Sequence, residues 1–111
     1  MLELDAEDEK LVVLARSTRA RTQAAEGAAV RDSDGRTYAA CTVRLQSFQV
    51  SALQAAVAAA VSSGAEDLEA AVLVTDSAAV AQESIHAVHD VGPRALVYRA
   101  DISGEVHEVV R

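Results

Sequence analysis

Cysteine is almost absent from this chain. Cys41 is the one cysteine among 111 residues, so neither a disulfide framework nor an all-cysteine zinc site can form within one chain. Because Cys41 follows a run of small residues on a predicted strand, we interpret it as a buried, unreactive thiol. A nucleophilic cysteine would need an electropositive setting, and Arg44 alone supplies little positive charge there.

Aromatic and basic side chains are also scarce. Aromatics make up 3% of the residues and include no Trp, so the chain lacks the stacking rings that single-stranded nucleic acid sites usually need. The chain has ten basic and 17 acidic residues, which gives a net charge of −7. This negative charge argues against a nucleic-acid or anionic-membrane binder. Arg16, Arg19 and Arg21 could form a local basic patch, but we interpret them as a solvated helix face with acidic neighbours.

Long hydrophobic runs are missing. No apolar stretch approaches the roughly 20 residues that a membrane span needs. The N-terminus, MLELDAEDEK, is acidic, whereas a signal peptide begins with a basic segment followed by an apolar run. Half of the residues are nevertheless hydrophobic, which is typical of a folded chain. We therefore expect a single domain over residues 1–111, located in the cytoplasm and not in a membrane.

The hydrophobic pattern alternates between helical and strand periods. Helices are expected over residues 4–23, 48–64 and 77–92, capped by Asp5 at the first and by Asp76 or Ser77 at the third. Strands are expected in a hairpin about the turn DSDG, in LEAAVLVTD, in RALVYRAD and in EVHEVV. This order, αββαβαββ, predicts a three-layer α/β/α fold, in which a mixed sheet of about five strands has helices on both faces.

The predicted helix FQVSALQAAVAAAVSSG has few groups that could perform chemistry. Alanine covers most of its circumference, which predicts a helix buried on several sides and ended by Gly64. We interpret it as a tightly packed core helix. A second reading remains open, in which its small residues allow close packing against its counterpart in another subunit.

The segment GAAVRDSDGRTYAACTV resembles the front of the small homo-oligomeric cytidine deaminases. In that family a Val-Gly-Ala-Ala strand leads into an Asp-Gly turn and then into a strand that ends in Gly-Cys-Asn. Here Gly27, Asp34, Gly35 and Cys41 occupy the matching places. The likeness extends over about residues 10–110, and it implies the deaminase fold.

The resemblance does not extend to the catalytic groups. Family members hold zinc with one thiolate from a Cys-Ala-Glu and two from a Pro-Cys-x-x-Cys, and the Glu moves protons. By counting from Gly64, the first motif falls on Ser51-Ala52-Leu53. By counting from Val88, the two other thiolates fall on Gln82 and Ile85. The chain is therefore identified as a degenerate member, with no catalytic residue, no zinc and no other cofactor expected.

The residues that contact the substrate in the family are also replaced in this chain. The family's substrate-contacting Phe, Asn and Glu map to Ala24, Thr42 and Arg44. The former pocket is therefore expected to be relined by six residues: Ala24, Thr42, Ser51, Leu53, Gln82 and Ile85.

A histidine-containing helix face offers an alternative metal site. Glu83, His86 and Asp90 lie three or four residues apart, with His89 beside them. Such a motif needs matching carboxylates from other helices, and none occupies a core position, so we interpret this face as exposed and polar. His107, on the last strand, is expected at the surface.

Three functional hypotheses follow. The leading one is a non-catalytic assembly or interaction module, a homo-oligomer (dimer or tetramer) or a companion subunit of an unknown protein partner. The second is a domain that binds a small neutral, nucleoside-like ligand in the relined pocket. The third is an enzyme, such as a deaminase with an atypical site or one that uses metal-independent chemistry, in which Glu83 or Cys41 would act.

Overall fold

The computed structural model describes residues 3–111. They form three helices, one five-stranded sheet and one small two-stranded hairpin. The helices are α1 (Ala6–Thr22), α2 (Ala52–Ser62) and α3 (Gln82–Val91). The strands are β1 (Gly27–Asp32), β2 (Thr37–Cys41), β3 (Val43–Arg44), β4 (Gln49–Val50), β5 (Leu68–Val74), β6 (Leu96–Ala100) and β7 (Val106–Val110). The predicted order is confirmed, apart from the additional pair β3 and β4.

The main sheet is mixed, in the order β2-β1-β5-β6-β7. Strand β1 pairs antiparallel with both β2 and β5, β5 pairs parallel with β6, and β6 pairs antiparallel with β7. The β1–β2 connection is the predicted hairpin, and Gly35 takes a positive φ of 85° in its turn. Asp32 holds this turn, because its carboxylate accepts hydrogen bonds from the backbone of Asp34 and Arg36 and from the Tyr38 hydroxyl.

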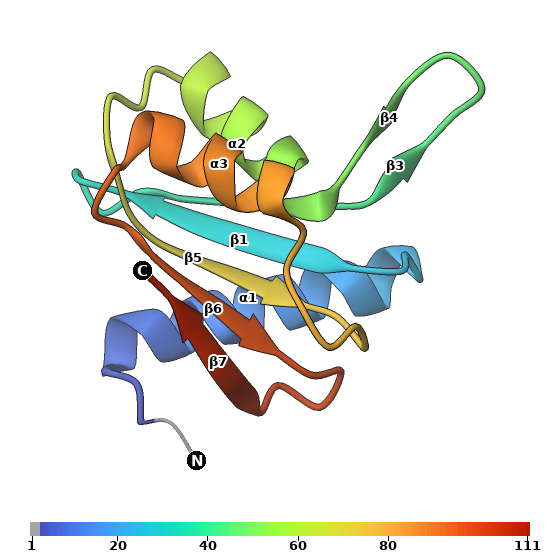
Figure 1. The fold of residues 1–111 in the computed structure, drawn as a ribbon, viewed down its shortest axis with the longest axis horizontal. Coiled ribbons are helices and arrows are strands. Elements are labelled where there is room, and N and C mark those ends of the chain that lie inside the picture. Colours follow the sequence, from blue (N-terminus) through green and yellow to red (C-terminus); the bar gives the residue numbers. More distant parts are fainter. Residues whose placement is uncertain (1–2) are drawn as a thin grey trace.

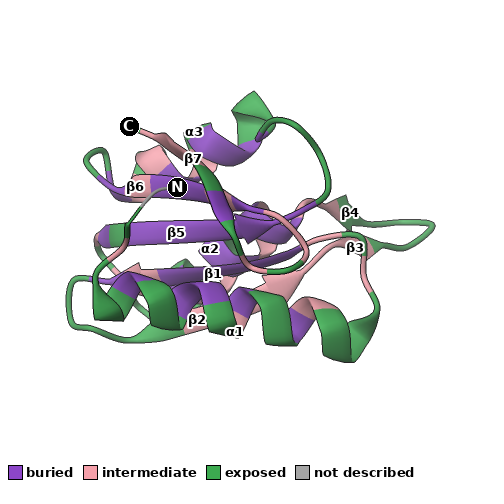
Figure 2. Ribbon diagram, turned by 90° about the horizontal axis from the view of Figure 1, so that it is seen from below, coloured by how far each residue is buried: buried purple, intermediate pink, exposed green. Residues whose placement is uncertain are grey.

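Helices cover both faces of the sheet, as predicted (Figure 1). Helix α1 packs on one face against β1, β2 and β5, while α2 and α3 pack together on the other face. Strands β1 and β5 are accordingly buried between the layers, whereas the outer side of α1 is exposed (Figure 2). None of the helices within residues 3–111 is both long enough and apolar enough to cross a membrane.

Helix α1 is fixed to the sheet by a buried polar cluster as well as by apolar packing. Asp8, on the inner side of the helix, lies 2.9 Å from Nη2 of Arg31 on β1. Its other oxygen accepts a hydrogen bond of 2.8 Å from the Tyr98 hydroxyl on β6. Arg31 also reaches Glu69 on β5, at 3.1 Å. One helix and three strands are therefore joined through one guanidinium, two carboxylates and one phenol.

The second helix begins later than its composition predicts. Residues 48–50 belong to β4 and to the turn before it, and α2 begins at Ala52 after the cap Ser51. The backbone N–H of Leu45 donates to the carbonyl of Phe48, which closes the β3–β4 hairpin. We call residues 42–50 the arm, because they project beyond the end of α2 and away from the sheet (Figure 1). Gly64 follows α2 with a positive φ of 98°, as expected of a helix stop.

The third helix also begins later than predicted, at Gln82, and no side chain caps it. Ser77, one of the two expected caps, instead hydrogen-bonds locally to Thr75 and Ala79. Such local side-chain bonds compete with helix formation. Residues 76–79 therefore form bends, residues 80–81 are irregular, and the predicted start of this helix is wrong by five residues.

Candidate functional site

The N-terminal ends of α2 and α3 meet at a pair of serine hydroxyls. Ser51 caps α2: its Oγ accepts the N–H of Gln54 at 3.1 Å, and the Gln54 side chain accepts the N–H of Ser51. The same Oγ lies 2.7 Å from Oγ of Ser84 on α3, which is 3% exposed. One hydroxyl therefore caps a helix and joins it to its neighbour.

A second polar group lies where β1 and β2 meet the end of β5. The Thr42 hydroxyl accepts the backbone N–H of Glu26 at 3.1 Å. The carboxylate of Glu26 accepts a hydrogen bond of 2.7 Å from the hydroxyl of Thr75, which is 1% exposed. These contacts hold Glu26 beside an open hollow of about 270 Å³ at the base of the arm. The hollow is lined by Glu26, Thr42, Val43, Arg44, Gln49, Val50, Ser51 and Gln54.

Two of the six residues predicted to reline the pocket come together in this hollow, namely Thr42 and Ser51. Leu53 is completely buried in the core below α2, and Ile85 is 7% exposed in the same cluster. Gln82 is exposed at the start of α3, and Ala24 is half-buried in the loop before β1. None of these four residues lines the hollow.

The α3 residue opposite Ser51 is Ser84, not Gln82 or Ile85. Counting back from Val88 places the expected thiolate position at Ile85, one residue too far along the helix. One residue turns a side chain by about 100° around a helix, which separates a core position from one that faces Ser51. Ser84, Glu26 and Thr75 were not singled out from the sequence. Of these three residues, only Thr75 could have been found from the sequence, because it directly follows a continuous apolar strand.

The residues at this junction do not fit the zinc ion that the resemblance implies. Structural and catalytic zinc sites in proteins use thiolate, imidazole and carboxylate ligands. Ser51 and Ser84 offer only neutral hydroxyls, which are bonded to each other. Leu53, at the expected position of the proton-transferring carboxylate, is an alkyl side chain with no exposed surface.

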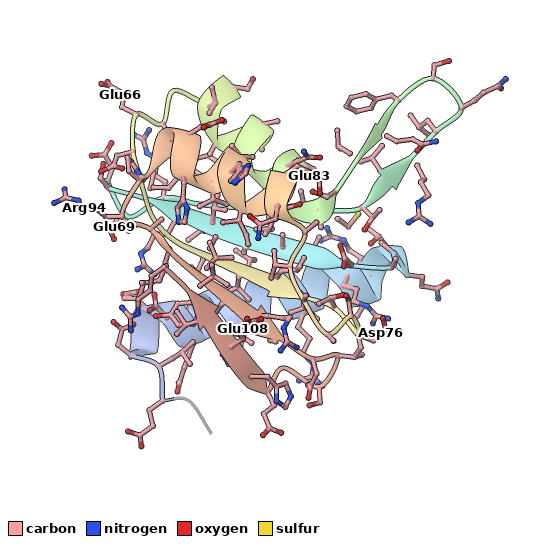
Figure 3. The ribbon with its side chains drawn as sticks, viewed as in Figure 1. Glu66, Glu69, Asp76, Glu83, Arg94 and Glu108 are labelled. Atoms are coloured by element: carbon pink, nitrogen blue, oxygen red, sulfur yellow. The ribbon has the colours of Figure 1, made fainter. Side chains whose placement is uncertain are left out.

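The histidines do not provide a replacement site. Glu83 and His86 are exposed on α3, and Glu83 lies in its first turn (Figure 3). His89 is half-buried, and its Nε2 lies 3.0 Å from the backbone oxygen of Ala95. The α3 side chains therefore do not form a cluster of three metal-ligating groups in the part of the chain that the structure describes.

His107 is exposed on β7, as predicted, and contacts the β6–β7 turn. Its Nε2 lies 2.7 Å from Oδ2 of Asp101, and Glu105 lies close to both. The other oxygen of Asp101 accepts hydrogen bonds from Ser103 and from the backbone of Glu105. The bond from the Ser103 hydroxyl lowers the pKa of the Asp101 carboxyl most strongly, followed by the contact with His107 and the bonds from the two backbone N–H groups. The cluster is accounted for by the turn that it stabilises.

The serine pair leads to a prediction about stability. Ser51→Ala removes both a helix cap and the interhelical bond, so we expect a loss of about 1–3 kcal/mol in the free energy of unfolding. Ser84→Ala leaves the cap in place and should cost only about 1 kcal/mol. Urea denaturation followed by circular dichroism measures both, with Ser62→Ala at the exposed end of α2 as a control. Equal losses in the two variants would contradict the dual role of Ser51.

Comparison with known proteins agrees with this fold. The family model described as cytidine deaminase-like matches residues 4–104. The curated proteins include no match. Among solved structures, cytidine deaminase from Burkholderia pseudomallei superposes with a TM-score of 0.79 at 20% identity, over 91% of this chain and 89% of that one. The enzyme from Mycobacterium tuberculosis gives a TM-score of 0.71 at 23% identity, over 86% of this chain and 85% of that one. The enzyme from Mycobacterium leprae gives a TM-score of 0.70 at 21% identity, over 84% of this chain and 87% of that one. Because the family model covers nearly the whole chain, this protein belongs to the cytidine deaminase-like family.

Proposed function

We propose that this chain is a non-catalytic member of its family that acts in the cytoplasm as an oligomeric assembly or interaction module. The observation that carries the proposal is the 2.7 Å bond between Ser51 and Ser84. It joins two neutral hydroxyls at the helix junction where the deaminase resemblance implies thiolates. Two hydroxyls that already satisfy each other neither hold a zinc ion nor activate water.

The surface around α2 supports the assembly role. This helix contains no charged residue. The adjoining arm exposes Leu45 (59%) and Phe48 (55%), the single Phe of the chain. Exposed apolar groups that gather in one region mark protein–protein contacts more often than scattered ones do. A protein of this size with an Ala- and Val-rich core would also gain stability from association.

Metal content and turnover test the absence of catalysis. Untagged protein, expressed with added zinc, should contain almost no zinc by elemental mass spectrometry. It should also show no conversion of cytidine to uridine by absorbance. A zinc-to-protein ratio near one would contradict the non-catalytic reading, as would turnover that disappears on Glu83→Gln or Cys41→Ser. The oligomeric mass, from light scattering after size exclusion, tests the assembly role separately.

The hollow beside Ser51 favours a second candidate function, the binding of a small neutral ligand. Its lining combines the Thr42 and Ser51 hydroxyls with the amides of Gln49 and Gln54. These neutral groups can hold a ligand through hydrogen bonds, and the two charged residues of the lining, Glu26 and Arg44, have opposite charges. A rise in melting temperature with cytidine or uridine, lost on Thr42→Val, would favour ligand binding over a purely structural role.

A further inference from the structure

A second hollow, larger than the one at the helix junction, lies on another part of the surface. It is a groove of about 880 Å³ between the first half of α1 and the β6–β7 turn. Its apolar lining includes Val12 and Val106, which are buried, and Val13, which is 64% exposed. This makes Val13 the most exposed of the large hydrophobic side chains described. An exposed valine beside buried apolar groups in a groove is the kind of surface that a partner covers.

The rim of this groove is acidic. Glu3, Glu9 and Glu105 contribute three carboxylates, against the single guanidinium of Arg16. The stem of Arg16 passes beside Gly104 at the turn, with its Cδ close to the glycine. The groove therefore combines an apolar lining with a net negative rim, and a complementary partner would present apolar side chains next to a positive charge.

The arm has the complementary composition. It exposes Phe48 and Leu45, and it carries Arg44 but no carboxylate. Arg44 is exposed and forms no ion pair with any residue between 3 and 111. Two apolar side chains and one cation thus lie within five residues of a projecting hairpin.

The arm and the groove lie on different sides of one molecule. The arm leaves the body beside α2, whereas the groove is formed by α1, which covers the opposite face of the sheet (Figures 1 and 2). A contact between them must join two molecules. Because the two surfaces differ, each copy can offer its arm to one neighbour and its groove to another.

We propose that the arm of one copy docks in the α1 groove of a second copy, with Phe48 and Leu45 against the apolar lining and Arg44 at the acidic rim. This inference rests on the proposed assembly function and names the surfaces that perform it. Reciprocal docking of two arms in two grooves gives a two-fold dimer, and docking passed on from copy to copy gives a closed ring or an open filament.

Light scattering after size exclusion tests the contact over a range of protein concentrations. Phe48→Ser on the arm and Val13→Asp in the groove should each reduce the mass to that of a single chain. Arg44→Glu should shift the equilibrium in the same direction, because it brings a carboxylate against three others. Val61→Asp provides the matched control: this valine is also half exposed, but on α2, and its variant should keep the wild-type mass.

Cross-linking provides a second measurement that does not depend on loss of assembly. In a Cys41→Ser background, a Phe48→Cys chain mixed with a Val13→Cys chain should form a disulfide-linked pair, and Val61→Cys in place of Val13→Cys should not. A multimer that survives Phe48→Ser and Val13→Asp but is lost in Val61→Asp would overturn this contact and leave the assembly function standing. A wild-type chain that is monomeric at every concentration would overturn both.

Discussion

Asp8→Ala should unfold more readily than the wild type by about 3–5 kcal/mol, since it removes one member of a buried ion pair. Asp8 is 6% exposed, and its two oxygens contact Arg31 at 2.9 Å and Tyr98 at 2.8 Å. After the substitution, the guanidinium keeps only Glu69, and the phenol of Tyr98 loses its acceptor. Burial, followed by the bond to Asp8, raises the pKa of Tyr98 to about 12, as expected of a hydroxyl that donates to a buried carboxylate.

Urea denaturation followed by circular dichroism measures this loss, and Glu7→Ala provides the control one residue earlier on α1. Glu7 is exposed and lies 3.6 Å from Lys10, so its removal should change stability only slightly. Tyr98→Phe should fall between the two, because it removes one hydrogen bond but leaves the ion pair intact. If Asp8→Ala lowered the free energy of unfolding no more than Glu7→Ala does, α1 would be fixed to the sheet by its apolar side chains alone.

The order of the main elements could be predicted because its signals are local. The turn DSDG between two runs of small and β-branched residues predicts a hairpin whatever surrounds it, and Gly35 takes the positive φ that this turn requires. Asp5 caps α1 as expected, by accepting the N–H of Asp8. The strands β3 and β4 have two residues each, which is too short for any period to show. Their sequence, read together with the alanines that follow, therefore looks like the start of a helix.

The candidate site was less predictable because its contacts span long stretches of chain. Ser51 was found by counting back from Gly64, a stop that the structure places just after α2. Ser84 was missed because the same procedure on α3 assumed the register of an intact family motif. Glu26 meets Thr75 across 49 residues, and nothing in either local segment indicates that contact.

The position of Leu53 leads to the second large effect. Leu53→Glu would return a carboxyl group to the place where the family resemblance expects one, yet this side chain has no exposed surface and packs in the core cluster beneath α2. A carboxylate there has no partner, so we expect the variant to lose roughly 3–5 kcal/mol in the free energy of unfolding, comparable to breaking a buried pair. It should also gain no cytidine deaminase activity, since Ser51 and Ser84 provide no ligand for zinc.

The matched control is Leu53→Met, a volume-conserving change that should cost less than about 1.5 kcal/mol. Thermal and urea denaturation of the two variants separates the effect of charge from that of shape. A Leu53→Glu protein as stable as Leu53→Met would mean that position 53 reaches the hollow beside Ser51, and that the former pocket is still open to water. The expected large difference would mean that the leucine has become part of the core. A zinc site at this junction would then require repacking the region beneath α2 as well as supplying new ligands.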